Sequence, residues 1–140
     1  MKEKLLELNE IAERYNESVL SKVDENHFKK FIDWTNDSVS HIPEKDFLEL
    51  YEVANGFEFN GLIIYSLNES NDNNIYDLNE EWEDDEDLKN YIFFGDSDIT
   101  WYCYDKVNKV FCELDKPSAT LMESHECFSD LISAALESIL

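Results

Sequence analysis

Apolar residues recur at spacings of three and four along four stretches of the chain, and this periodicity predicts four helices. The first carries an apolar stripe from Leu5 to Val19, with Glu and Lys on its other face. Asp24 is expected to cap a short second helix, and Pro43 suits the first position of a third, where its missing N–H costs nothing. The fourth is expected to run from about Glu126, so helices both open and close the chain.

Two helix boundaries are predicted from single residues. Gly56 can adopt the left-handed backbone conformation that suits a helix C-terminus, so the third helix is expected to end at Asn55-Gly56. Ser124 is a suitable N-cap for the last helix, because its hydroxyl can accept a hydrogen bond from the first turn. All three glycines, Gly56, Gly61 and Gly95, are assigned to turns, which leaves none for a phosphate-binding loop.

Between the third and fourth helices the apolar residues form short runs, which predict strands. These runs are 62–67, a weak 75–78, 91–94, 99–104, 110–114 and 119–122. Residues 105–109 supply a tight turn in which Asn108 suits a positive φ, so the flanking strands should form a hairpin, although its register stays open. Helices before and after a single antiparallel sheet define an α+β domain, with helices packed on one face of the sheet.

Two segments carry a family resemblance. Ile42 to Tyr65 is typical of a proline-led helix that stops at Asn-Gly and turns into an apolar strand, and Tyr91 to Asp98 is typical of a strand ending in a Gly-Asp-Ser loop. With the paired strands and the closing helix, this arrangement resembles the SMI1/KNR4 (SUKH) superfamily. The resemblance covers residues 42–140, whereas the N-terminal helices in 1–41 are not diagnostic.

The resemblance implies a binding protein. Many bacterial members of the superfamily are immunity proteins that neutralise toxin domains, often nucleases, and others are scaffolding or regulatory proteins. Neither a catalytic residue set nor a cofactor comes with the resemblance.

The net charge narrows the class of partner. Among 140 residues, 33 are Asp or Glu and 11 are Lys or Arg, which gives a formal net charge of -22. DNA and RNA are disfavoured as ligands because phosphate neutralisation needs a basic footprint, whereas a cationic protein would be steered toward this chain. A hydrophobic content of 43% still provides for a folded core in one domain spanning 1–140.

Half of that charge lies in residues 66–98, which hold twelve acidic residues and one lysine. The densest run is 80–87, where acids flank Trp82 on both sides. One interpretation is a solvated loop, the usual explanation of a charge run. The other is a partner-binding surface, with aromatic anchors and with charges that set the association rate. Its residues would be Asp72, Glu80, Glu81, Trp82, Glu83, Asp84, Asp85, Glu86, Asp87, Asp96, Asp98 and Trp101.

The alternation of side chains along a strand bears on whether Trp101 is exposed. Trp101 and Tyr102 are consecutive, so they should point to opposite faces of the sheet. One of them is therefore expected near the surface, unless both faces are covered. An exposed aromatic at this position would extend the patch around Trp82.

Catalytic and metal sites are only weakly indicated. The run 95–98 could belong to a Gly-Asp-Ser hydrolase, but a serine nucleophile needs a histidine base, and only His125 follows Ser97. The three histidines are scattered, and 68–74 lacks the Gly and terminal Glu of a calcium loop. We therefore expect no enzymatic activity, no cofactor and no metal site.

The cysteines and the N-terminus bear on the compartment. Cys103, Cys112 and Cys127 are odd in number and lack metal-type spacing, which favours reduced, buried thiols over an extracellular disulfide framework. Charge interrupts every apolar run near the N-terminus, and no segment approaches the roughly 20 apolar residues of a membrane span. A cytoplasmic protein without a membrane partner is expected.

Two functions follow as hypotheses. The first is an immunity-type protein that neutralises a basic toxin domain, possibly a nuclease, by stoichiometric non-covalent binding. The second is a cytosolic regulatory or scaffolding adaptor that binds an endogenous protein. A neighbouring gene for a large protein with a basic C-terminal domain would favour the first.

Overall fold

The computed structural model describes all 140 residues, as one six-stranded sheet and five helices. Each strand is antiparallel to the next, and the strands follow in space the order they have in the sequence. The predicted α+β class with a single antiparallel sheet is confirmed. The strands are β1 (Phe57–Phe59), β2 (Leu62–Ile64), β3 (Tyr91–Asp96), β4 (Thr100–Asp105), β5 (Val110–Asp115) and β6 (Leu121–His125).

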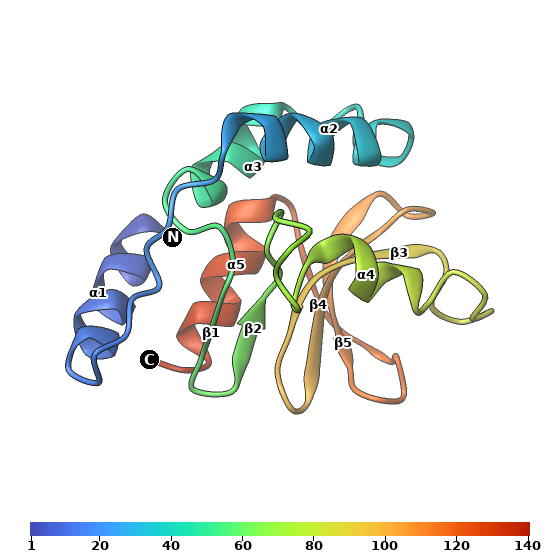
Figure 1. Cartoon of the computed structure of the whole chain (residues 1–140). Helices are drawn as coiled ribbons and strands as arrows, with labels where there is room; N and C mark the ends of the chain where they lie inside the picture. The colour runs from blue at the N-terminus through green and yellow to red at the C-terminus, as the bar shows by residue number, and fades with distance from the viewer.

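The helices are α1 (Lys2–Glu13), α2 (Glu25–Val39), α3 (Glu44–Tyr51), α4 (Ile75–Glu80) and α5 (Phe128–Glu137). Helix α5 packs on the sheet, α1 and α3 pack on α5, and α2 packs on α3 (Figure 1). Asp24 caps α2 as predicted, since its carboxylate accepts hydrogen bonds from the backbone N–H groups of Asn26 and His27. The capped helix is longer than expected, at 15 residues.

Phe128 at the start of α5 forms the centre of the core on this face of the sheet. Its ring centroid lies 5.0 Å from that of Phe47 on α3, 5.0 Å from that of Phe94 on β3 and 5.8 Å from that of Phe111 on β5. Aromatic pairs at such distances stabilise a core beyond the area that they bury. The long helices are thereby fixed to the middle strands.

The opposite face of the sheet is covered at β3 and β4. Phe93 and Trp101 point away from α5, and α4 with the residues after it packs over them (Figure 1). Trp101 is 5% exposed and Tyr102 is 2% exposed, so the alternation that should have brought one of them to the surface buries both. The expectation that Trp101 extends an exposed patch is wrong.

Residues 75–78 form the start of helix α4 instead of a weak strand. Asn74 is the N-cap, and its side-chain oxygen accepts a hydrogen bond from the Asp77 N–H at 2.9 Å. The apolar run was too short to distinguish the two states, and the cap decided between them. Strand β1 was not predicted, and β2 ends at Ile64 instead of Leu67.

Gly61 lies in the turn between β1 and β2 as predicted, whereas Gly56 and Gly95 have other roles. Helix α3 ends at Tyr51, and Pro43 is its N-cap and not its first residue. Gly56, with φ +75°, instead leads into β1, where a Cβ would lie 2.6 Å from the Ser66 nitrogen. Gly95 lies inside β3, at an irregularity in the pairing with β4, and a Cβ there would lie 2.6 Å from the Ile63 carbonyl oxygen. Close approach of backbone requires glycine at both positions.

The hairpin of β4 and β5 is confirmed, and its register pairs Cys103 with Cys112 and Tyr104 with Phe111. The residue with positive φ in the turn is Lys109 and not Asn108. Asp105, the first residue of the turn, stabilises it, because its carboxylate accepts hydrogen bonds from two backbone N–H groups within the turn. The expected cap of the last helix is also corrected: Ser124 lies in β6, and Cys127 is the N-cap, without a side-chain hydrogen bond.

Candidate partner-binding surface

Residues 80–87, here called the acidic segment, leave α4 at its C-terminal end and form the loop on the right in Figure 1. Trp82 attaches this segment to the sheet. Its ring centroid lies 6.2 Å from that of Phe93 and 5.7 Å from that of Trp101, and the second pair is T-shaped. Trp82 is only partly buried, so one part of the indole packs on the core and the rest remains accessible.

Asn79 provides a second attachment, at the end of α4. Its amide donates hydrogen bonds to the carbonyl oxygens of Ile75 at 2.7 Å and Phe93 at 2.9 Å, and accepts one from the Phe93 N–H at 2.8 Å. Strand β2 pairs with β3 only at Gly95 and Asp96, so the Asn79 side chain takes the place of a neighbouring strand at Phe93. The base of the acidic segment is therefore fixed by hydrogen bonds to buried backbone.

The carboxylates of the acidic segment divide into one structural residue and six free ones. Asp85 is partly buried, and it accepts hydrogen bonds from the N–H groups of Asp87 and Leu88, which closes a turn. The exposed acids are Glu80, Glu81, Glu83, Asp84, Glu86 and Asp87. Their one ion pair joins Glu86 to Lys89 at 3.0 Å, and Glu86 stays 86% exposed in it. An exposed pair of this kind contributes little to stability, so the charge remains available to a partner.

The other acids predicted for the surface lie in different settings. Asp96 is held by the Tyr65 hydroxyl and by the Lys116 ammonium, the latter at 3.2 Å, and its side chain is 18% exposed. Burial, and then the Asp96 carboxylate, raises the pKa of the Tyr65 phenol. Asp96 is thus a structural ion-pair residue, whereas Asp98 is exposed at the turn between β3 and β4.

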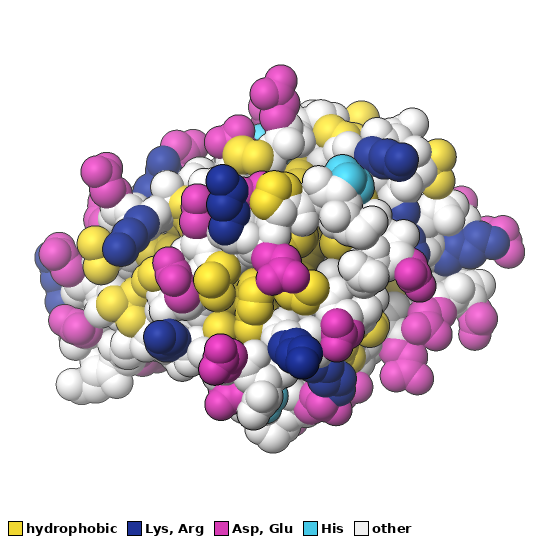
Figure 2. Space-filling model, turned by 90° about the horizontal axis from the view of Figure 1, so that it is seen from above, with side chains coloured by type: hydrophobic (Ala, Val, Ile, Leu, Met, Phe, Trp, Pro, Cys, Tyr) yellow, Lys and Arg dark blue, Asp and Glu magenta, His cyan; other side chains and the backbone are white.

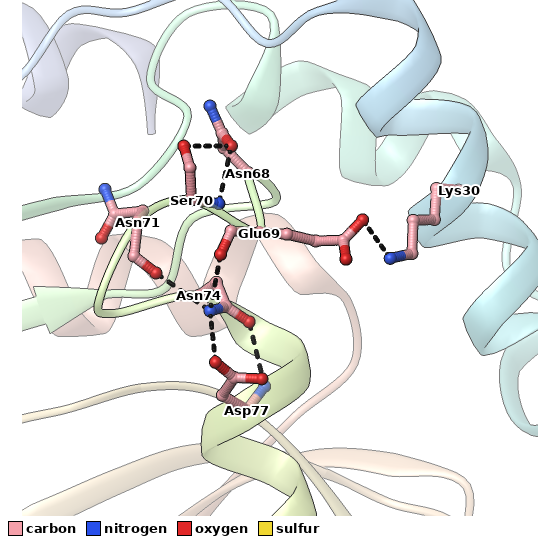
Figure 3. Close-up of polar contacts among 7 residues, drawn as sticks. All are labelled: Lys30, Asn68, Glu69, Ser70, Asn71, Asn74 and Asp77. Carbon is pink, nitrogen blue, oxygen red and sulfur yellow. Dashed lines mark hydrogen bonds and ion pairs between the residues drawn. The ribbon is translucent and has the colours of Figure 1, made fainter.

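Asp72 lies in residues 68–74, here called the asparagine loop. Asn74 is 1% exposed and lies at its centre, where its amide donates hydrogen bonds to the carbonyl oxygens of Glu69 and Asn71 and to the Asp77 carboxylate (Figure 3). Asp72 itself is exposed. No hydrogen bond or ion pair connects this loop to the acidic segment.

Helix α2 holds the asparagine loop from the other side. Lys30 forms an ion pair with Glu69 (Figure 3), and its ammonium lies 4.5 Å from the centroid of the Tyr76 ring. Burial, followed by the Glu69 carboxylate, raises the pKa of Tyr76 to about 12. The asparagine loop is therefore fixed by the hydrogen bonds of Asn74 and by the contacts of Lys30 on α2.

Trp34 on α2 was missed by sequence reasoning. Its position in the sequence carries no signal that could link it to a segment almost fifty residues away. Its side chain is 39% exposed and its ring packs against Tyr76, with centroids 5.3 Å apart. Together with Trp82 and Tyr91 it lines a hollow of about 170 Å³, which Glu83, Lys89 and Lys106 also border. The structure thus places an exposed tryptophan beside the acidic segment.

Acidic side chains are not confined to this segment. Figure 2 shows the face formed by α2 and α3, where Asp and Glu side chains are spread over the whole outline, with lysines between them and an apolar strip across the middle. The net charge of -22 therefore steers a cationic partner to the molecule as a whole. The hollow and the acidic segment distinguish one region of this acidic surface from the rest.

The residues of the hydrolase alternative lie apart. Ser97 precedes β4, and its hydroxyl accepts hydrogen bonds from the N–H groups of Ile99 and Thr100. His125 lies at the other end of the sheet, opposite Phe111, and pairs with Glu113 at 2.7 Å. A serine needs its histidine within hydrogen-bond reach, so this geometry does not assemble the pair. The absence of esterase, phosphatase and nuclease turnover remains a prediction for assay.

Comparison with protein-family models finds no match, and comparison with curated proteins finds none either. None of the five helices has the length and apolar content needed to cross a bilayer.

Proposed function

We propose that this chain is an immunity-type binding protein, which neutralises a basic toxin domain by stoichiometric, non-covalent binding at the acidic segment. One observation carries the proposal: six exposed carboxylates lie on a segment that Trp82 and Asn79 fix to the sheet. Fixed charges are already in place when a cationic partner arrives, so little conformational freedom is lost on binding. A solvated loop would not need these two attachments.

The hollow beside the segment gives the partner a place for an anchor. An apolar or aromatic side chain fits among Trp34, Trp82 and Tyr91, while basic residues of the same partner meet Glu83 and its neighbours. Tryptophan and tyrosine are enriched among the residues that dominate binding energy, and charges around them set the rate of encounter. The resemblance to the SMI1/KNR4 superfamily, which includes immunity proteins, selects a toxin domain as the partner.

The test begins at the adjacent reading frame. If it encodes a protein with a basic C-terminal domain, that domain is expressed alone and together with this chain, and cell growth is measured. Wild-type chain should restore growth. A variant with the six exposed acids replaced by Gln or Asn, and Asp85 retained, should not. The matched control neutralises six exposed acids on and near α1 and α3, on the far side of the molecule: Glu3, Glu7, Glu10, Glu17, Glu49 and Glu52.

Both variants have the same net charge, so they separate general steering from a specific surface. Equal rescue by both would overturn the acidic segment as the binding site. A neighbouring domain that neither inhibits growth nor binds the chain would favour an adaptor with an endogenous partner.

Surface plasmon resonance against the same domain, across a salt series, tests the roles of single residues. Glu83→Gln with Asp84→Asn should slow association at low salt and leave dissociation nearly unchanged, because screening removes long-range steering. Trp34→Ala and Trp82→Ala should accelerate dissociation by at least tenfold, as expected for aromatic anchors. Wild-type rates from all three variants would place the interface elsewhere.

A further inference from the structure

Two of the three cysteines face each other across the centre of the sheet. Cys103 on β4 and Cys112 on β5 are direct partners in the register, and they are 0% and 1% exposed as free thiols. Directly opposed residues of antiparallel strands have Cα atoms about 4.5 to 5.5 Å apart, within the range of about 4.4 to 6.8 Å that a disulfide spans. Because opposed residues share a face, both thiols point to the same side.

That side is the one covered by α4 and the acidic segment. Cys103 is the strand partner of Phe93 and lies two residues after Trp101, and both of these aromatic residues pack against Trp82. Tyr91 is also close, since the two thiols, after burial and Asp105, contribute to raising the pKa of its phenol. Cys103 is therefore flanked by the two aromatic residues on which Trp82 packs, and Tyr91 lies near both thiols.

We propose that Cys103 and Cys112 are a redox pair, which closes to a cross-strand disulfide by exchange with a low-molecular-weight disulfide. One thiol loses its proton and attacks a sulfur of that disulfide, which forms a mixed disulfide and releases one small thiolate. The second cysteine then loses its proton and attacks the protein sulfur of the mixed disulfide, which releases the second small thiolate. The protein loses two electrons and two protons, and the small disulfide is reduced to two thiols.

Access limits the rate of this exchange. Burial, and next the neighbouring Cys112, raises the pKa of the Cys103 thiol well above its ordinary value, so the thiolate that attacks is scarce in the closed protein. Opening of the aromatic cover exposes both sulfurs to the small disulfide. The rate of disulfide formation therefore depends on how often the acidic segment detaches from the sheet at Trp82. This dependence does not require any particular partner of the segment.

Cys127 supplies an internal control. It lies at the N-cap of α5, is partly exposed and has no cysteine opposite it. A reagent that oxidised every accessible thiol would reach Cys127 first and leave it as a mixed disulfide. The proposed pair instead ends as a protein disulfide with no small molecule attached.

The experiment incubates the folded chain with oxidised glutathione, blocks remaining thiols by alkylation and maps the peptides by mass spectrometry. We expect one linked peptide pair containing Cys103 and Cys112, free thiol at those positions to fall to near zero, and full recovery of the thiols with dithiothreitol. Cys127→Ser should form the same link. Cys112→Ala should abolish it, and circular dichroism shows whether that variant is folded.

The wild-type map decides the matter even if Cys112→Ala does not fold. Free thiols at Cys103 and Cys112 after prolonged incubation, or glutathione adducts without the link, would overturn the proposal. Trp82→Ala should accelerate link formation at least several-fold, whereas Trp82→Phe should stay close to wild type. Equal rates in both variants would show that the cover does not control access.

Discussion

The asparagine loop and the acidic segment are two polar stretches of similar length, separated only by α4, and the fold uses them in opposite ways. In the asparagine loop four of the seven residues are exposed, but its polar side chains bond one another and nearby backbone. Asn74 is almost completely buried among such hydrogen bonds (Figure 3). In the acidic segment six of seven carboxylates point to solvent, and Trp82 is the residue that turns inward.

The difference follows from the donors and acceptors available. An asparagine amide carries both, so a cluster of asparagines can pair its members with one another and with backbone. An ionised carboxylate only accepts, and neighbouring carboxylates repel, so burial of such a run would leave charges unpaired. Polar character alone does not say whether a segment is structural or free for a partner, whereas its inventory of donors and acceptors does.

We expect the largest loss of stability from a substitution at the base of the asparagine loop. Gly56→Val forces a branched side chain into φ +75° and against Ser66, whose N–H and carbonyl oxygen bond Asn73 and Ile75 at the two ends of the turn. The conformational penalty and the clash together should lower the free energy of unfolding by about 4 kcal/mol or more. Urea denaturation measures this. Gly61→Ala is the control, since no atom lies within 4 Å of a Cβ there and only the conformational penalty remains.

Asn74→Ala removes the centre of the asparagine loop. The substitution leaves the Asp77 N–H and the Glu69 and Asn71 carbonyl oxygens without this partner, and it deletes the cap of α4. We expect a loss of about 3 kcal/mol in unfolding free energy. Asn71→Ala, at an exposed position, should cost about 1 kcal/mol or less. Similar losses from both variants would contradict the view that Asn74 organises the loop.

Trp82→Ala tests whether the acidic segment is attached as the structure indicates. Loss of packing on Phe93 and Trp101 should lower the unfolding free energy by about 2 kcal/mol, less than for a fully buried aromatic residue. Amide hydrogen exchange should become faster in the acidic segment and stay unchanged in α1. Uniform acceleration over the whole chain would instead indicate that Trp82 belongs to the global core.

We expect the smallest change in stability from substitutions that compare Asp85, the structural acid of the acidic segment, with an exposed acid beside it. Asp85→Ala should cost about 1 kcal/mol, because the N–H groups of Asp87 and Leu88 lose their acceptor. Asp84→Ala, next to it, should leave the melting temperature unchanged at high salt and raise it slightly at low salt, where repulsion is relieved. Differential scanning calorimetry at two salt concentrations distinguishes the two positions. An equal response would mean that Asp85 is another free surface charge.

The sequence by itself determined the features that depend on residues a few positions apart. Periodicity located the long helices, Asp24 began the second one, and the turn at 105–109 joined β4 to β5. The same reasoning placed the acidic segment at the surface, because a run of like charges cannot be buried. These features are local, so the chain carries their signal in one short window.

Tertiary structure decided what depends on residues far apart in the chain. It buried Trp101 under Trp82, joined Asp96 to Lys116, and brought Trp34 from α2 to the edge of the acidic segment. Long-range packing is set by the shape and order of whole elements, and no spacing in the sequence encodes it. Which polar residues became structural and which stayed free was therefore settled only when the sheet and helices met.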